Sequence, residues 1–108
     1  MDLHNYREQI DEIDDQLLIL FMERMDVARQ IALYKKKYGL STLDAARERE
    51  KLSYIGKKAG EELSPYAHKL YNVLFQLSRA YQESTINAGD AHPGAPLEIR
   101  NSEFGIRN

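Results

Sequence analysis

The stretch Leu3–Tyr38, LHNYREQIDEIDDQLLILFMERMDVARQIALYKKKY, contains no proline or glycine and decides the fold. Its apolar residues recur at alternating spacings of three and four, which predicts one amphipathic helix. This apolar stripe consists of Leu3, Tyr6, Ile10, Ile13, Leu17, Leu20, Val27, Ile31, Tyr34 and Tyr38. At about 1.5 Å per residue the helix would be roughly 50 Å long, which exceeds the diameter of so small a domain. One chain therefore cannot bury the stripe, and its 3.5-residue repeat favours a second copy of the same helix as partner.

Two shorter helices are predicted after Gly39, a glycine placed where a left-handed C-cap would end the long helix. The second helix begins within Ser41–Asp44, whose side chains can cap it, and runs to Gly60. The third takes Ser64 as its N-cap and Pro65 in its first turn. Its apolar stripe is Leu70, Val73, Leu74, Leu77 and Tyr81. The predicted fold class is all-α, with one long, one short and one medium helix per chain.

The length and composition of the chain exclude several classes of protein and kinds of site. The chain has 108 residues and a net charge of −2, which indicates one small globular domain without general attraction to nucleic acid. It has no cysteine and three widely separated histidines, so we expect neither a disulfide framework nor a metal site. The acidic, polar N-terminus is unlike a signal peptide and no apolar run could span a membrane, so we expect a cytoplasmic location.

The composition divides the chain near its C-terminus. Residues 1–85 contain all of the periodic sequence and form the predicted domain. Residues 86–108 are rich in glycine and proline and lack periodicity. We interpret them as a linker, a junction to a fused domain or a cloning remnant.

Cations interrupt the stripe of the long helix. Arg24 replaces an apolar residue between Leu20 and Val27, and burying it requires an anion. An ion pair between helices would satisfy it, but Lys35 lies eleven residues later on nearly the same face. Arg7 lies about 25 Å from Arg24 along the helix, so both cannot hold one small ligand within a chain. An antiparallel partner would bring Arg7 of one chain toward the Arg24–Lys35 half of the other.

The two shorter helices carry two further sets of polar residues. Four charged residues share one face of the second helix: Asp44, Arg47, Glu48 and Lys51. Taken alone, they favour an exposed, salt-bridged surface. Ser78 and Gln82 are four residues apart beside the apolar stripe of the third helix, where neutral polar groups need partners. A structural contact or a lined pocket would explain them.

The ordered set of these motifs resembles the all-helical chorismate mutases. It begins with Arg7-Glu8-x-Ile10-x-x-Ile13-Asp14-x-x-Leu17-Leu18 and continues with Glu23-Arg24, Lys35, Asp44-x-x-Arg47-Glu48 and Ser78-x-x-x-Gln82. Each element alone is weak, but the set covers residues 3 to about 85 in the order and spacing of that family. The resemblance implies an intertwined helical homodimer with two active sites, each completed by an arginine of the other protomer. Members are often fused to another aromatic-pathway enzyme.

The resemblance also implies a reaction, a substrate and three catalytic residues. Chorismate, a dicarboxylate, would rearrange to prephenate by a cofactor-free [3,3] sigmatropic step in phenylalanine and tyrosine biosynthesis. Arg24 and the partner subunit's Arg7 would bind the two carboxylates. Lys35 would contact a carboxylate and the ether oxygen, to which Gln82 would also donate a hydrogen bond. Arg24, Lys35 and Gln82 are thus the catalytic candidates.

The remaining residues of the motif would line the pocket. Glu48, together with the backbone near Asp44, would hold the ring hydroxyl, while Arg47 and Ser78 would complete the wall. Two alternatives share much of this sequence pattern. An isochorismate pyruvate-lyase has the same helical fold and an overlapping pocket, and a non-catalytic dimerisation module needs only the stripe. The module does not explain why Arg24, Lys35, Glu48 and Gln82 occur together, and nucleic-acid binding has still less support because acids balance the basic residues.

Overall fold

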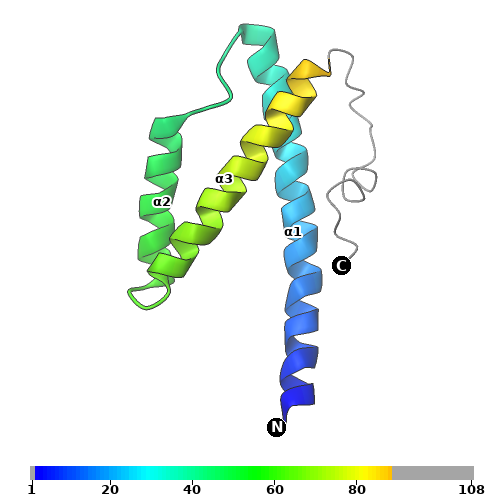
Figure 1. The fold of residues 1–108 in the computed structure, drawn as a ribbon, viewed down its shortest axis with the longest axis vertical. Coiled ribbons are helices and arrows are strands. Elements are labelled where there is room, and N and C mark those ends of the chain that lie inside the picture. The colour runs from blue at the N-terminus through cyan, green and yellow to red at the C-terminus, as the bar shows by residue number, and fades with distance from the viewer. Residues whose placement is uncertain (1, 89–108) are drawn as a thin grey trace. The chain divides into compact units, whose positions relative to one another are not determined.

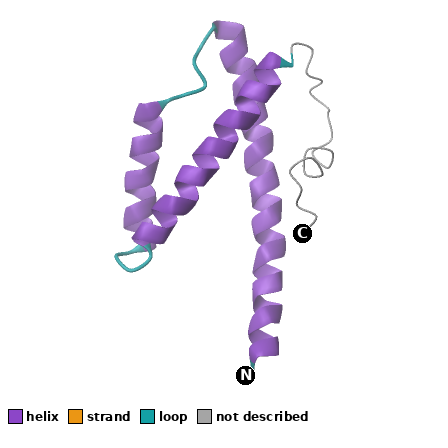
Figure 2. Ribbon diagram, in the orientation of Figure 1, coloured by secondary structure: helices purple, strands orange, loops and turns teal. Residues whose placement is uncertain are grey.

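The computed structural model describes residues 2–88, which form three helices and, over that range, no strand (Figures 1 and 2). The helices are α1 (Leu3–Tyr38), α2 (Ala45–Ala59) and α3 (Ser64–Asn87). The predicted all-α class, with one long, one short and one medium helix, is confirmed. Residues 89–108, which make up most of the predicted tail, lie outside the described residues.

The chain between α1 and α2 turns where the sequence predicts. Gly39 has a φ of 66°, the left-handed conformation that glycine adopts most easily. Beyond it, the Leu40 N–H donates to the Lys35 carbonyl at 2.8 Å, which satisfies one of the last acceptors of α1. Asp44 is the N-cap of α2, and its carboxylate accepts a hydrogen bond of 3.0 Å from the Arg47 N–H.

The turn between α2 and α3 differs by one residue from the prediction. Ser64 was expected to be the N-cap, but it is already the first residue of α3, and Leu63 precedes it without a side-chain cap. The reason is the tightness of the turn, because the Ser64 N–H already donates to the Gly60 carbonyl at 2.8 Å. Pro65 lies in the first turn of α3, as expected.

Helices α2 and α3 form an antiparallel pair (Figure 1). They approach closely at Gly56, where an added Cβ would lie 2.7 Å from His68 Nε2 and 3.0 Å from the Ser64 hydroxyl. Only a residue without a side chain leaves the His68 ring in this position. Gly56 therefore leaves room for the His68 side chain between the two helices near their connecting turn.

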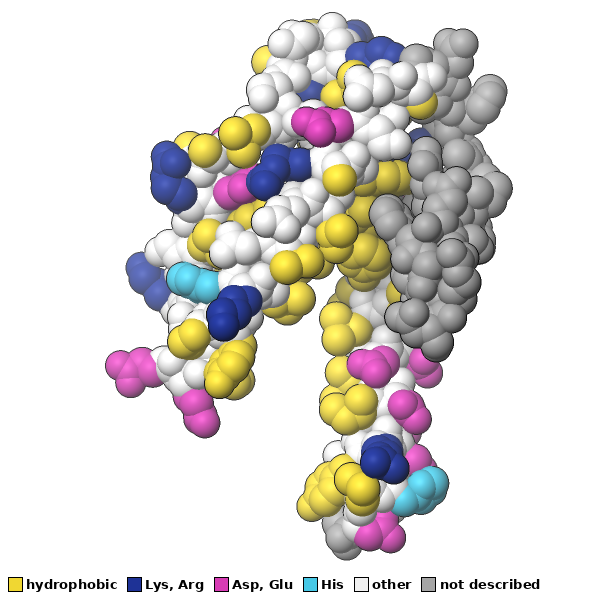
Figure 3. Space-filling view, viewed as in Figure 1, with side chains coloured by type: hydrophobic (Ala, Val, Ile, Leu, Met, Phe, Trp, Pro, Cys, Tyr) yellow, Lys and Arg dark blue, Asp and Glu magenta, His cyan; other side chains and the backbone are white. Residues whose placement is uncertain are grey.

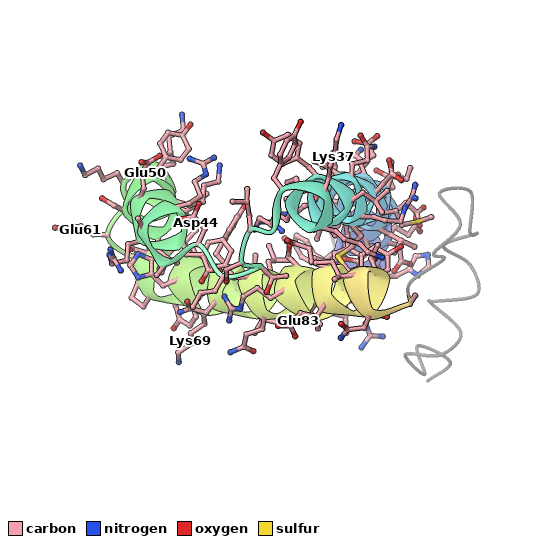
Figure 4. The ribbon with its side chains drawn as sticks, turned by 90° about the horizontal axis from the view of Figure 1, so that it is seen from above. Lys37, Asp44, Glu50, Glu61, Lys69 and Glu83 are labelled. Atoms are coloured by element: carbon pink, nitrogen blue, oxygen red, sulfur yellow. The ribbon has the colours of Figure 1, made fainter. Side chains whose placement is uncertain are left out.

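The structure consists of two parts, residues 2–27 and residues 28–88. Within residues 28–88, the end of α1 crosses the C-terminal half of α3 in both views (Figures 1 and 4). Ala28 and Ala32 on α1 are buried, and so are Phe75, Tyr81 and Thr85 on α3. The small alanine side chains allow a neighbouring helix to come close. Lys35 follows Ala32 by three residues on α1, and Gln82 directly follows Tyr81 on α3.

The apolar stripe of α1 is uncovered in the single chain. Its ten residues from Leu3 to Tyr38 are each between 42% and 61% exposed. Along the N-terminal half of α1, hydrophobic side chains form a column on one side of the helix (Figure 3). One chain therefore leaves this surface uncovered, as the length of the helix predicts. Within residues 2–88, no helix is long and apolar enough to cross a membrane.

Candidate active site

Lys35 lies near the end of α1 and is bound to the loop that follows it. Its Nζ donates a hydrogen bond of 3.0 Å to the Thr42 carbonyl, in a partly buried position. The Thr42 hydroxyl in turn donates to Glu83 Oε1 on α3 at 3.3 Å. Lys35, the loop and the C-terminal half of α3 are therefore linked by two successive hydrogen bonds.

Gln82 and Ser78 form a polar pair on α3. Gln82 is 5% exposed, and its Nε2 donates to the Ser78 Oγ at 3.0 Å. Its other amide atom, Oε1, is buried and has no hydrogen-bond partner among the described residues. A buried acceptor without a partner is costly and uncommon, so this glutamine is poorly explained as a structural residue alone.

Glu48 on α2 forms an ion pair with Arg79 on α3, through Oε2 and Nη1. The side chains are 24% and 29% exposed respectively. The sequence pattern does not identify Arg79 as a site residue. Its position directly after Ser78 is a weak signal, because the pairing depends on how α2 packs against α3.

Arg47 has a different environment, although it precedes Glu48 directly. Its Nη1 pairs with Glu50 Oε1 at 2.8 Å, and both side chains are largely exposed. In Figure 4, Glu50 points away from α3, while Asp44 lies at the beginning of α2. The polar face of α2 therefore divides into an exposed pair at Arg47 and a partly buried pair at Glu48.

Arg7 and Arg24 lie in the N-terminal part of α1. Arg7 is exposed, and Arg24 is half-buried. Seventeen residues of helix separate them by about 25 Å along the axis and about 100° around it. The two guanidinium groups cannot both contact one small ligand within a chain.

The polar groups in residues 28–88 suit the recognition of a small polar anion. They comprise the Lys35 ammonium, the Gln82 amide, the Ser78 hydroxyl and the Glu48 carboxylate held by Arg79. Among residues 2–88 there is no cluster of three or more His, Cys, Asp or Glu side chains that could hold a metal ion. The described residues thus define an all-helical protein whose polar groups include a cation and hydrogen-bond donors that suit an anionic ligand.

The profile of the chorismate mutase type II family matches residues 6–83. This range includes every motif residue named above, from Arg7 to Gln82. No curated protein and no solved structure matches the chain significantly. The chain belongs to the chorismate mutase type II family. It is an isomerase that converts chorismate to prephenate, the step that leads to phenylalanine and tyrosine.

Proposed function

We propose that the chain catalyses this reaction as a homodimer with two composite active sites. In each site, Arg24, Lys35 and Gln82 of one protomer act on a chorismate molecule whose second carboxylate is bound by the partner's Arg7. Glu48 and the backbone near Asp44 hold the ring hydroxyl, and Ser78 and Arg47 complete the wall.

The observation that carries this proposal is the uncovered stripe on α1. Ten apolar side chains between 42% and 61% exposed follow one face of one helix, a contiguous arrangement that scattered exposure does not explain. Burying one such side chain fully contributes about 1.5–3 kcal/mol, so association of two stripes is strongly favourable. A second copy offers the same repeat over the same length.

The position of Arg7 supports a site to which both protomers contribute, rather than a site formed within one chain. It is exposed near the far end of α1 and cannot reach a ligand bound by Arg24 of its own chain. In an antiparallel pair of long helices, the N-terminal end of one helix lies beside the C-terminal half of the other. Arg7 of each protomer would then complete the site of its partner.

The reaction requires that the substrate be positioned and that the negative charge developing on it be stabilised. One carbon–oxygen bond breaks and one carbon–carbon bond forms in a single step, and negative charge develops on the ether oxygen. A positioned cation and an amide donor stabilise that charge more strongly than mobile water does, because they are already oriented. Holding both carboxylates also selects the compact conformer in which the reacting carbons meet.

Gln82 can supply the amide donor by rotating its terminal amide. Nε2 now donates to Ser78, and Oε1 has no partner among the described residues. A serine hydroxyl both donates and accepts, so a half-turn of the amide keeps the contact with Ser78 through Oε1. The same rotation frees Nε2 to donate to the ether oxygen and removes the unpaired buried acceptor.

A complementation experiment tests the composite site. Arg7→Ala and Lys35→Ala each damage both sites of their own homodimer, whereas a mixed dimer retains one undamaged site. We expect the two variants, refolded or co-expressed together, to regain up to a quarter of wild-type chorismate turnover, because about half of the dimers are mixed. Confirmed mixed dimers without activity would overturn the shared site.

Cytoplasmic location is also part of the proposal. The chain has no cysteine, so no disulfide adapts it to an oxidising compartment. Cell fractionation followed by immunoblotting tests this point.

A further inference from the structure

The ion pair between Glu48 and Arg79 joins two helices inside the candidate site. Glu48 lies one turn after Asp44 on α2, and Arg79 lies between Ser78 and Gln82 on α3. Both residues of the pair are thus next to positions assigned to the substrate. Arg79 itself belongs to none of the motifs that define the site.

This pair differs from the exposed ion pairs of the same chain. His4–Glu8, which is an ion pair when His4 is protonated, lies within α1, and Arg47–Glu50 lies within α2; their side chains are 59–78% exposed. Exposed pairs of this kind contribute little to stability. Arg79 and Glu48 are only 29% and 24% exposed and lie 31 residues apart in sequence. Two partly desolvated side chains held between helices have a defined orientation, which exposed pairs lack.

We propose that Arg79 is a positioning residue that orients the Glu48 carboxylate toward the substrate. Arg79 occupies Oε2, so the orientation of Oε1 is fixed as well. Oε1 is then the acceptor for the ring hydroxyl of chorismate. The inference rests on the proposed role of Glu48.

The guanidinium also compensates the charge of Glu48. Chorismate carries two carboxylates, and an uncompensated carboxylate in the wall of a partly dry site would repel them. Arg79 leaves Glu48 able to accept a hydrogen bond while cancelling most of its net charge. A neutral glutamine at position 48 would avoid the repulsion but would be a weaker acceptor than a carboxylate.

The test compares chorismate with an analogue that lacks the ring hydroxyl. In the full chain, Arg79→Leu should lower kcat/KM for chorismate about tenfold or more, the usual effect of losing an oriented charged hydrogen bond. It should lower kcat/KM for the analogue less, because the analogue loses the charge compensation but has no hydroxyl for Glu48 to hold. Arg79→Lys should recover part of the loss. An equal loss with both substrates would show that Arg79 does not act through the ring hydroxyl, and it would overturn the inference.

A double-mutant cycle gives an independent readout. If Arg79 acts through Glu48, Arg79→Leu should have little further effect on chorismate turnover in the Glu48→Gln background. Additive losses would overturn the inference. Arg49→Leu, which removes an exposed arginine of α2, is the matched control and should leave both substrates unaffected. Wild-type turnover separates the two hypotheses: an inactive wild type contradicts the proposed function, whereas an active wild type with an active Arg79→Leu variant contradicts only this inference.

Discussion

Lys35 Nζ lies 3.0 Å from the backbone carbonyl of Thr42, so the ammonium group holds the loop that connects α1 to α2. An ammonium has three N–H donors, and this contact uses one of them. Two donors remain for a carboxylate and an ether oxygen. The carbonyl also restricts the long lysine side chain, which would otherwise lose more conformational entropy when substrate binds.

Replacing Lys35 with methionine should abolish most turnover without unfolding the chain. Methionine keeps the apolar stem but has no charge, so the developing negative charge on the ether oxygen loses a positioned cation. Losing one such donor typically costs a factor of about 100 to 1,000 in kcat. Steady-state kinetics with chorismate and circular dichroism of the same sample measure both effects.

Lys37→Met is the control for that variant. Lys37 is exposed and close to the Tyr38 ring, at 5.4 Å from its centroid. Its removal should leave kcat unchanged. Near-normal turnover in a folded Lys35→Met protein would contradict the catalytic assignment of Lys35.

Replacing Gln82 with leucine should separate stability from activity. Leucine has a similar size and removes the buried Oε1 that has no partner among the described residues. An unsatisfied buried acceptor costs about 1–3 kcal/mol, so the free energy of unfolding should stay level or rise. Activity should nevertheless fall strongly, because the ether oxygen loses its amide donor.

Thermal unfolding and kcat should be measured together for this variant. Gln76→Leu, an exposed position on the same helix, is the control and should preserve activity. A Gln82→Leu protein that loses stability and keeps its activity would show that the glutamine is structural.

The helices and their ends were predictable because they depend on local sequence. Gly39 adopts the left-handed conformation, and Asp44 caps α2, as their residue types indicate. Ser64 was displaced by one residue because a tight turn, rather than a capping side chain, starts α3. The local preferences of the residues therefore predict the helices, and the geometry of one turn shifts the start of α3 by one residue.

The pairing of Arg79 with Glu48 could not be predicted in the same way. Arg79 is two residues from both Leu77 and Tyr81, which places it about 160° from the apolar stripe of α3. A cation at such a position is normally solvated. Glu48 likewise lies on a face of α2 that suggested exposed salt bridges. The packing of α2 against α3 brings the two side chains together, and helical periodicity contains no information about that packing.

The effect of Gly56→Ala on the free energy of unfolding should depend on the side chain at position 68. Alanine is favoured over glycine inside a helix by about 1 kcal/mol. In the wild-type chain, however, its Cβ would lie 2.7 Å from His68 Nε2, so the imidazole or the helix must shift. We expect Gly56→Ala to be less favourable for the free energy of unfolding in the wild type than in a His68→Ala chain, where only the Ser64 hydroxyl, at 3.0 Å, stays close to the added Cβ. Urea denaturation of the wild type, the two single variants and the double variant measures this double-mutant cycle, and an equal effect of Gly56→Ala in both backgrounds would contradict the close contact.

A negative charge in the α1 stripe should prevent dimerisation. Ile13 is 52% exposed in the single chain, so Ile13→Asp removes few contacts within the chain and should leave its helical content similar. In a paired stripe the carboxylate would be buried without a partner, which costs several kcal/mol per chain. Sedimentation equilibrium should therefore show a monomer, and chorismate turnover should be lost because the partner's Arg7 is missing.

Ile19→Asp provides the matched control: Ile19 is 58% exposed but lies about 120° around α1 from Ile13, outside the stripe. An active dimer is expected for that variant. If Ile13→Asp remained an active dimer, the stripe would not be the interface; if it became an active monomer, the composite site itself would be wrong.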